Sequence, residues 1–138
     1  SQALNVLEHE VVVSGDSLRK LLSLVKEKNS QKDMKFYDAA FIGSLIRTVG
    51  KTKDSDQKEN VETEIIHIAS EILKERKGFL KLIKSDLSRE QLEILSACII
   101  SLSRVGGKKS REFLKTFLKM DEPLSHLAHA AMTELDQK

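Results

Sequence analysis

Apolar side chains recur every three or four residues along most of the chain, which is the spacing of one face of an α-helix. The pattern predicts helices over about 17–28, 33–49, 60–76, 89–105 and 109–120, and a last helix that starts at Asp121-Glu122-Pro123. A helix over 3–13 is also indicated, although consecutive valines weaken it, and 79–84 adds a short helical segment. The chain is therefore expected to be all-α.

Residues that begin and end helices stand at the edges of these segments. Ser88 is followed three residues later by Gln91, which is the spacing of a capping box. Gly50 is expected to end its helix in a left-handed conformation, and Gly106-Gly107 to end the helix over 89–105. Residues 51–60 contain no apolar side chain, so we expect a solvated loop that can include the first turn of the next helix.

Two segments of the chain are similar to each other. Residues 40–51 are AFIGSLIRTVGK and residues 97–108 are ACIISLSRVGGK, so seven of twelve positions are identical at an offset of 57. The last helix gives a weaker match at a further offset of 33, with Ala130 and Leu135 matching Ala97 and Leu102. An offset of 33 suits a repeat of two helices and two turns, and 57 suits the same repeat with a longer loop and a short extra helix.

On these segments the chain resembles the HEAT-repeat superfamily, over roughly 17–50 and 88–138. The best match is 92–135, where a helix ending in Val-Gly is followed by a helix pair joined at Asp121-Glu122-Pro123. The Val-Arg pair that commonly follows the family's Asp-Pro turn is missing, and 51–87 fits no repeat. The resemblance implies a right-handed α-α superhelix of about three antiparallel helix pairs, a short HEAT-like solenoid, with an irregular helical bundle as the alternative.

The composition is that of one globular domain with an aliphatic core. Of 138 residues, 40% are hydrophobic, 32% are charged and only 4% are aromatic. We expect a single HEAT-like helical domain over 1–138, and the missing initiator Met leaves open a fragment of a longer enzyme or regulator. A net charge of +2 gives no general attraction to nucleic acid or anionic membrane, and no apolar run has the roughly 20 residues of a membrane span. The expected location is cytoplasmic, without membrane insertion.

Side chains capable of chemistry are present, but not in the arrangement of a known site. Cys98, the single cysteine, excludes an intramolecular disulfide and lies in an apolar run typical of a core thiol. His126 and His129 share a helix face but lack the His-Glu-x-x-His arrangement, so exposed polar side chains are expected there rather than metal ligands. The segment 106–110, GGKKS, lacks the first Gly of a phosphate loop. We therefore predict no catalytic residue, no metal, no cofactor and no enzymatic activity.

The resemblance implies a protein-protein interaction scaffold or adaptor that binds another protein on the face lined by the inner helices. The candidate contact residues are the polar positions of those helices: Lys35, Asp38, Ser44, Arg47, Glu93, Ser101, Arg104, His126, His129 and Glu134.

Basic residues at equivalent helix ends suggest a different function. If the repeats stack, these ends form a basic edge that can bind an anion or a nucleic-acid backbone. The simpler interpretation is charge compensation at helix C-termini, and nucleic acid is not the expected partner. The edge comprises Arg47, Arg104, Lys51, Lys53, Lys108, Lys109 and Arg111.

Overall fold

The computed structural model describes residues 20, 23, 27, 36–51, 55–75, 87–120 and 122–137, and these residues form helices joined by turns. No strand occurs among them, so the predicted all-α class is confirmed for this part of the chain. The segments predicted to be helical over 3–13 and 79–84, and most of 17–28, lie outside the described residues. The helices are α3 (Phe36–Val49), α4 (Ser55–Glu75), α5 (Arg89–Val105), α6 (Lys108–Leu114) with the 3-10 helix η2 (Lys115–Lys119), and α7 (Leu124–Asp136).

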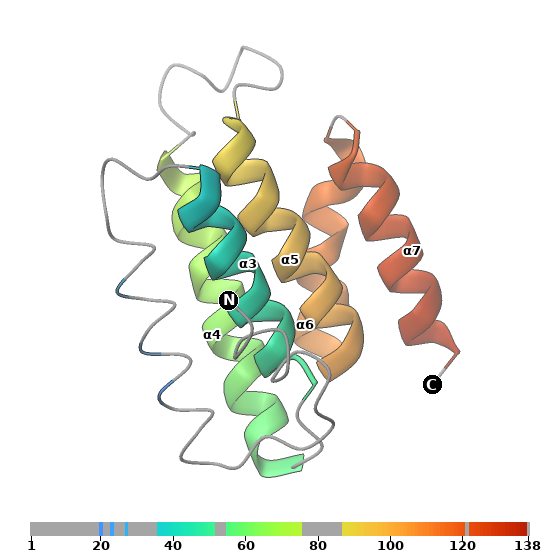
Figure 1. Cartoon of the computed structure of the whole chain (residues 1–138). Coiled ribbons are helices and arrows are strands. Elements are labelled where there is room, and N and C mark those ends of the chain that lie inside the picture. The colour runs from blue at the N-terminus through green and yellow to red at the C-terminus, as the bar shows by residue number, and fades with distance from the viewer. Residues whose placement is uncertain are drawn as a thin grey trace.

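The helices lie in two layers, with α3, α5 and α7 side by side and α4 and α6 behind them (Figure 1). The helices of the first layer run in one direction, and α4 and α6 run in the opposite direction. The central helix, α5, packs against α3, α4, α6 and α7. Because consecutive helices along the chain run antiparallel, neighbouring helices within each layer run parallel to each other.

The start of α5 follows directly from its local sequence. The Ser88 hydroxyl accepts a hydrogen bond from the Gln91 backbone N–H at 3.1 Å, and the Gln91 side chain accepts one from the Ser88 N–H at 3.0 Å. The predicted capping box is therefore present, and α5 spans the predicted 89–105.

Two other helix starts differ from the prediction. Helix α4 begins at Ser55 rather than near residue 60. Its first turns are polar and show no apolar periodicity, although Gln57, Lys58 and Glu59 among them are good helix formers. Helix α7 begins at Leu124, one residue after Pro123, and the Glu122–Pro123 peptide bond is cis. None of the described helices has the length and apolar content needed to cross a bilayer.

The core between the two layers is aliphatic, as the composition predicts. Helix α5 contributes more buried apolar side chains than any other described helix, and they cover more than one face because neighbours surround it. Phe117 is the largest fully buried side chain in the described part of the chain. The fully buried core residues from the other helices include Ile42, Ile46, Val61, Ile65, Leu114 and Ala128.

The glycines at the helix ends act differently from one another. Gly106 and Gly107 have φ of 65° and 125°, a region that side chains with a Cβ rarely enter, and they turn the chain from α5 into α6. Gly50 is not left-handed, so that prediction is wrong. Its lack of a side chain matters because α5 passes too close for one: a Cβ on residue 50 would lie 2.9 Å from the Cβ of Ser101.

Candidate protein-binding surface

The two similar segments lie against each other in three dimensions. Ser101 on α5 donates a hydrogen bond to the Ile46 carbonyl of α3 at 2.6 Å, and the Arg104 guanidinium donates one to the Arg47 carbonyl at 3.2 Å. Ala97 lies opposite Gly43 in the same contact. Helices α3 and α5 therefore run parallel, with Arg104 touching the residue that matches it at the offset of 57.

Small residues allow this close approach. Gly43 and Gly50 on α3 face Ala97 and Ser101 on α5, so the two backbones come nearer than larger side chains would permit. The Ser101 hydroxyl then reaches the last turn of α3, where it shares the Ile46 carbonyl with the Gly50 backbone N–H, which donates to the same oxygen at 3.1 Å. The contact is thus both a packing interface and a polar link between α5 and the last turn of α3.

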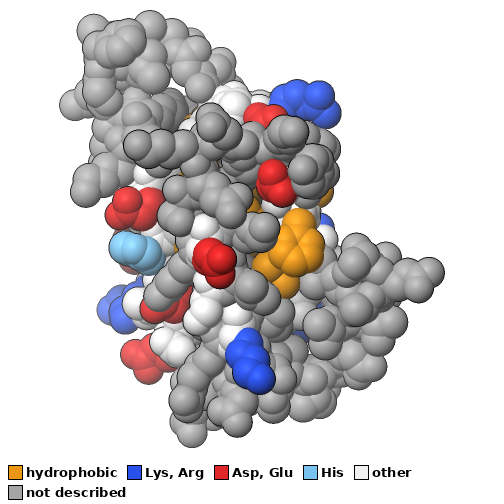
Figure 2. Space-filling model, turned by 60° about the vertical axis from the view of Figure 1, so that its left-hand side comes forward, with side chains coloured by type: hydrophobic (Ala, Val, Ile, Leu, Met, Phe, Trp, Pro, Cys, Tyr) orange, Lys and Arg blue, Asp and Glu red, His pale blue; other side chains and the backbone are white. Residues whose placement is uncertain are grey.

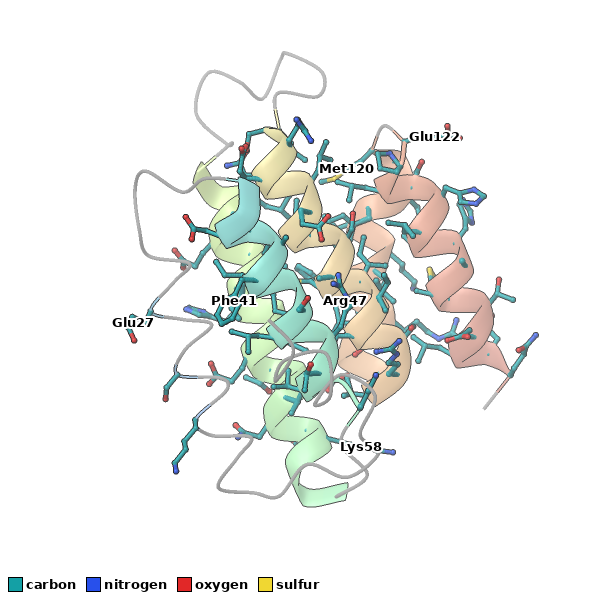
Figure 3. All side chains as sticks on the ribbon, in the orientation of Figure 1. Glu27, Phe41, Arg47, Lys58, Met120 and Glu122 are labelled. Carbon is teal, nitrogen blue, oxygen red and sulfur yellow. The ribbon has the colours of Figure 1, made fainter. Side chains whose placement is uncertain are left out.

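A polar cluster lies on the accessible side of this contact. Arg47 is 3.6 Å from the Glu93 carboxylate and donates a hydrogen bond to the Ser44 hydroxyl at 3.2 Å. The Arg47 and Glu93 side chains keep 24% and 30% of their surface exposed. Figure 3 shows Arg47 on α3 beside α5. The structure therefore brings together three of the residues predicted to contact a partner.

Other predicted contact residues have different positions. Asp38 is half-buried on α3 and Arg104 is exposed at the end of α5. Ser101 is fully buried, so its hydroxyl serves the α3–α5 contact and is not available to a partner. Lys35 and Lys53 lie outside the described residues.

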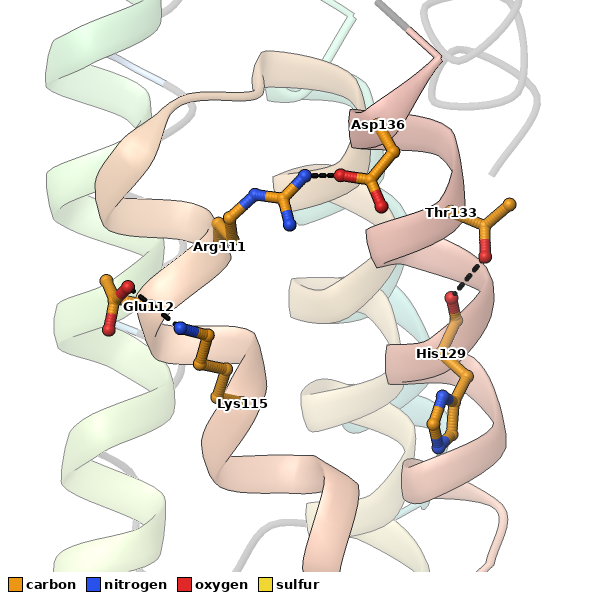
Figure 4. Close-up of polar contacts among 6 residues, drawn as sticks. All are labelled: Arg111, Glu112, Lys115, His129, Thr133 and Asp136. Carbon is orange, nitrogen blue, oxygen red and sulfur yellow. Dashed lines mark hydrogen bonds and ion pairs between the residues drawn. The ribbon is translucent and has the colours of Figure 1, made fainter.

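His126, His129 and Glu134 are exposed along α7 and do not belong to the polar cluster on α3 and α5. The His129 carbonyl accepts a hydrogen bond from the Thr133 hydroxyl at 3.0 Å, a contact within the helix (Figure 4). Within the described ranges, no group of three or more His, Cys, Asp or Glu side chains is arranged to hold a metal ion.

The residues of the predicted basic edge lie in different environments. Lys108 and Lys109 are exposed and Lys51 is half-buried. Arg111 forms an ion pair with Asp136 at the far end of α7 (Figure 4). On the face in Figure 2, the described acidic and basic side chains are interspersed rather than separated by sign.

A buried carboxylate that the sequence pattern does not indicate joins α4 to α6. Glu62 is 5% exposed and accepts hydrogen bonds from the Ser110 backbone N–H at 2.9 Å and from the Ser110 hydroxyl at 2.6 Å. Gly107, at the start of α6, has no side chain to cap that helix, so Glu62 supplies the acceptor from another element. The one feature of the sequence that indicates this contact is Gly106-Gly107 before α6, because a glycine has no side chain that could cap the helix.

Cys98 is a core residue of α5, as predicted. It is fully buried, and desolvation raises the pKa of its thiol from the usual 9.0 to about 12. A thiol that stays protonated at neutral pH is a poor nucleophile.

No family model, no curated protein and no solved structure matches this chain significantly.

Proposed function

We propose that the chain is a protein-binding scaffold built from stacked helix pairs, in the manner of a short HEAT-like solenoid. The observation that supports this most directly is the parallel contact between α3 and α5, in which Ser101 and Arg104 donate hydrogen bonds to the backbone of α3. Stacked repeats contact their neighbours in this way and expose one continuous helical face for partners.

The proposed binding surface is the accessible side of α3 and α5. Ser44, Arg47 and Glu93 form its centre, and Asp38 and Arg104 extend it along the two helices. Both charge signs are present, and the Arg47–Glu93 pair is partly exposed. A surface of this kind favours a partner that offers matching polar groups, and electrostatic complementarity then governs its specificity.

Site-specific photocrosslinking tests this surface. We would place a photoreactive amino acid at Asp38 or Glu93, and at the exposed α4 positions Asn60 and Glu71 as controls. The expected result is one protein crosslinked from both surface positions and from neither control. Equal crosslinking from all four positions, or none from Asp38 and Glu93, would contradict the proposal.

Amide hydrogen exchange of the captured complex provides a second measurement. The backbone N–H groups of α3 and α5 near Arg47 and Glu93 are expected to exchange more slowly in the complex. Slower exchange confined to the connections between helices would exclude α3 and α5 as the contact.

An anion-binding edge is the alternative, and one observation favours it. The parallel packing of α3 and α5 places their C-terminal basic residues at the same end, where Arg104 reaches the Arg47 carbonyl. Binding to duplex DNA should then weaken steeply with salt and fall in an Arg47→Glu/Arg104→Glu variant. An affinity that does not change with salt would exclude this alternative. The contact of Arg104 with the Arg47 carbonyl is also what the simpler interpretation predicts, because a cation at a helix C-terminus compensates the helix dipole.

A further inference from the structure

A groove opens between α4 and α6, on the layer that does not include α3 or α5. Among the described residues, its apolar side chains are Ile66 on α4 and Phe113 on α6, and both are only partly buried. None of its described lining residues comes from α3, α5 or α7. The described lining is Ile66, Lys108, Lys109, Glu112, Phe113 and Thr116.

The Phe113 ring packs against a second aromatic side chain. It packs edge-on against Phe117, with ring centroids 5.5 Å apart and an interplanar angle of 80°. Phe117 is fully buried, so Phe113 rests on the core while it also lines the groove. An apolar side chain entering the groove would therefore meet a preformed surface, which lowers the entropy cost of binding.

One end of the groove carries positive charge. Lys108 and Lys109 are exposed, and no ion pair involves either of them within the described residues. The acidic side chain in the groove, Glu112, pairs with Lys115 at 3.0 Å (Figure 4). Two lysines in the first turn of a helix oppose the helix dipole, so their position does not stabilise α6.

We propose that this groove binds an acidic amphipathic segment of a partner protein. The segment's apolar side chains would contact Ile66 and Phe113, and its carboxylates would pair with Lys108 and Lys109. Among the described residues the groove has two apolar side chains, both partly buried, which give little apolar surface to enter a bilayer and so favour a peptide over a membrane. The groove lies on a different layer from the α3–α5 surface, so either proposal can fail without the other.

The test begins with a displayed library of random short peptides selected on the whole chain. Enriched peptides are expected to combine Asp or Glu with Leu, Ile or Phe, and to shift the amide resonances of Ile66 and Phe113. A Lys108→Gln/Lys109→Gln variant should weaken binding by roughly tenfold or more, because two charge pairs are lost. Lys20→Gln/Lys119→Gln removes the same charge outside the groove lining and should leave affinity within about twofold.

Several outcomes would overturn the groove proposal. They are no enrichment, peptides without acidic residues, or affinity unchanged in Lys108→Gln/Lys109→Gln. Resonance shifts confined to α3 and α5 would also overturn it while supporting the proposed function. Phosphatidylcholine vesicles containing phosphatidylserine complete the test, and binding to them that requires Lys108 and Lys109 would replace the peptide with a lipid surface.

Discussion

At the residue scale, Glu62 joins two helices that are far apart in sequence. Its carboxylate satisfies both the backbone N–H and the hydroxyl of Ser110, and neither residue is exposed. The negative charge also lies at the positive end of α6, where Gly107 offers no side-chain acceptor. A Cβ on residue 107 would lie 2.6 Å from the Glu62 carboxylate, so the glycine and the carboxylate depend on each other.

We expect Glu62→Ala to lower the free energy of unfolding by about 1–3 kcal/mol, because the buried Ser110 donors lose their acceptor. Urea denaturation monitored by circular dichroism measures this loss. Ser110→Ala should cost less, since the backbone N–H of residue 110 keeps its acceptor.

Glu59→Ala is the control for this prediction, because Glu59 is exposed on the same helix. Its expected effect is within about 0.5 kcal/mol of zero. Equal losses in Glu59→Ala and Glu62→Ala would show that the contact with Ser110 contributes nothing to stability.

At the element scale, the spacing of α3 and α5 depends on residues without bulky side chains. Gly50 lies at the end of α3, where a Cβ would be 2.9 Å from the Cβ and 3.0 Å from the Cα of Ser101. Neither of those atoms can move without moving α5 itself. Gly43 differs, because a Cβ there would be 3.2 Å from the end of the Glu93 side chain and 3.5 Å from the Ala97 Cβ.

These distances predict opposite effects for the same substitution. Gly50→Ala should destabilise the protein by about 1–3 kcal/mol through overpacking. Gly43→Ala lies within the helix and should be neutral or stabilising, by up to about 1 kcal/mol, because Ala is the better helix former. Thermal unfolding of both variants would compare them, and a stabilising Gly50→Ala would contradict the close approach of α5.

The local sequence was enough to predict those helix starts and ends that depend only on residues nearby in the chain. The capping box at Ser88 and the Gly-Gly turn after α5 are examples. The start of α4 was missed because its first residues carry no apolar pattern. Gly50 was assigned the wrong role because a close helix approach is set by a residue more than fifty positions away.

The candidate surface was predictable only in part, for the same reason. The repeat placed Arg47 and Arg104 at equivalent helix ends, and in the structure the Arg104 guanidinium reaches the Arg47 carbonyl. It could not indicate that Ser101 is buried while its counterpart Ser44 stays partly exposed, because only the contact between helices distinguishes them. Glu62 resembled the other acidic residues of a charged helix, and Ser110 was needed to explain its burial.

At the scale of the whole molecule, α5 is the central element, and Cys98 lies at its buried middle. The helix packs against α3, α4, α6 and α7, so the thiol becomes accessible only when several helices separate. Exposure of the Cys98 thiol to solvent therefore indicates that the described core has opened as a unit.

The raised pKa of Cys98 predicts how stability depends on pH. Below pH 9.0 the thiol is protonated in both states, and the stability it contributes is fully present. Between pH 9.0 and about 12 only the unfolded thiol ionises, so the free energy of unfolding should fall by about 1.4 kcal/mol per pH unit.

Urea denaturation from pH 8 to 11 of the wild type and of Cys98→Ala would isolate this contribution. Lysine and tyrosine titrate in both proteins, so their effects cancel in the difference between the two curves. Parallel curves would mean that the Cys98 thiol ionises equally easily in the folded and unfolded chain.

The parallel contact between α3 and α5 joins different sides of two similar helices. On α3 the contact is formed by Gly43 and Gly50, whose counterparts at the offset of 57 are Ile100 and Gly107. On α5, however, the contact is formed by two other residues, Ala97 and Ser101. Positions that are identical between the two segments are therefore under unequal constraint. If the two segments arose by duplication, selection on this contact would act on different positions in each copy, so the copies would diverge asymmetrically.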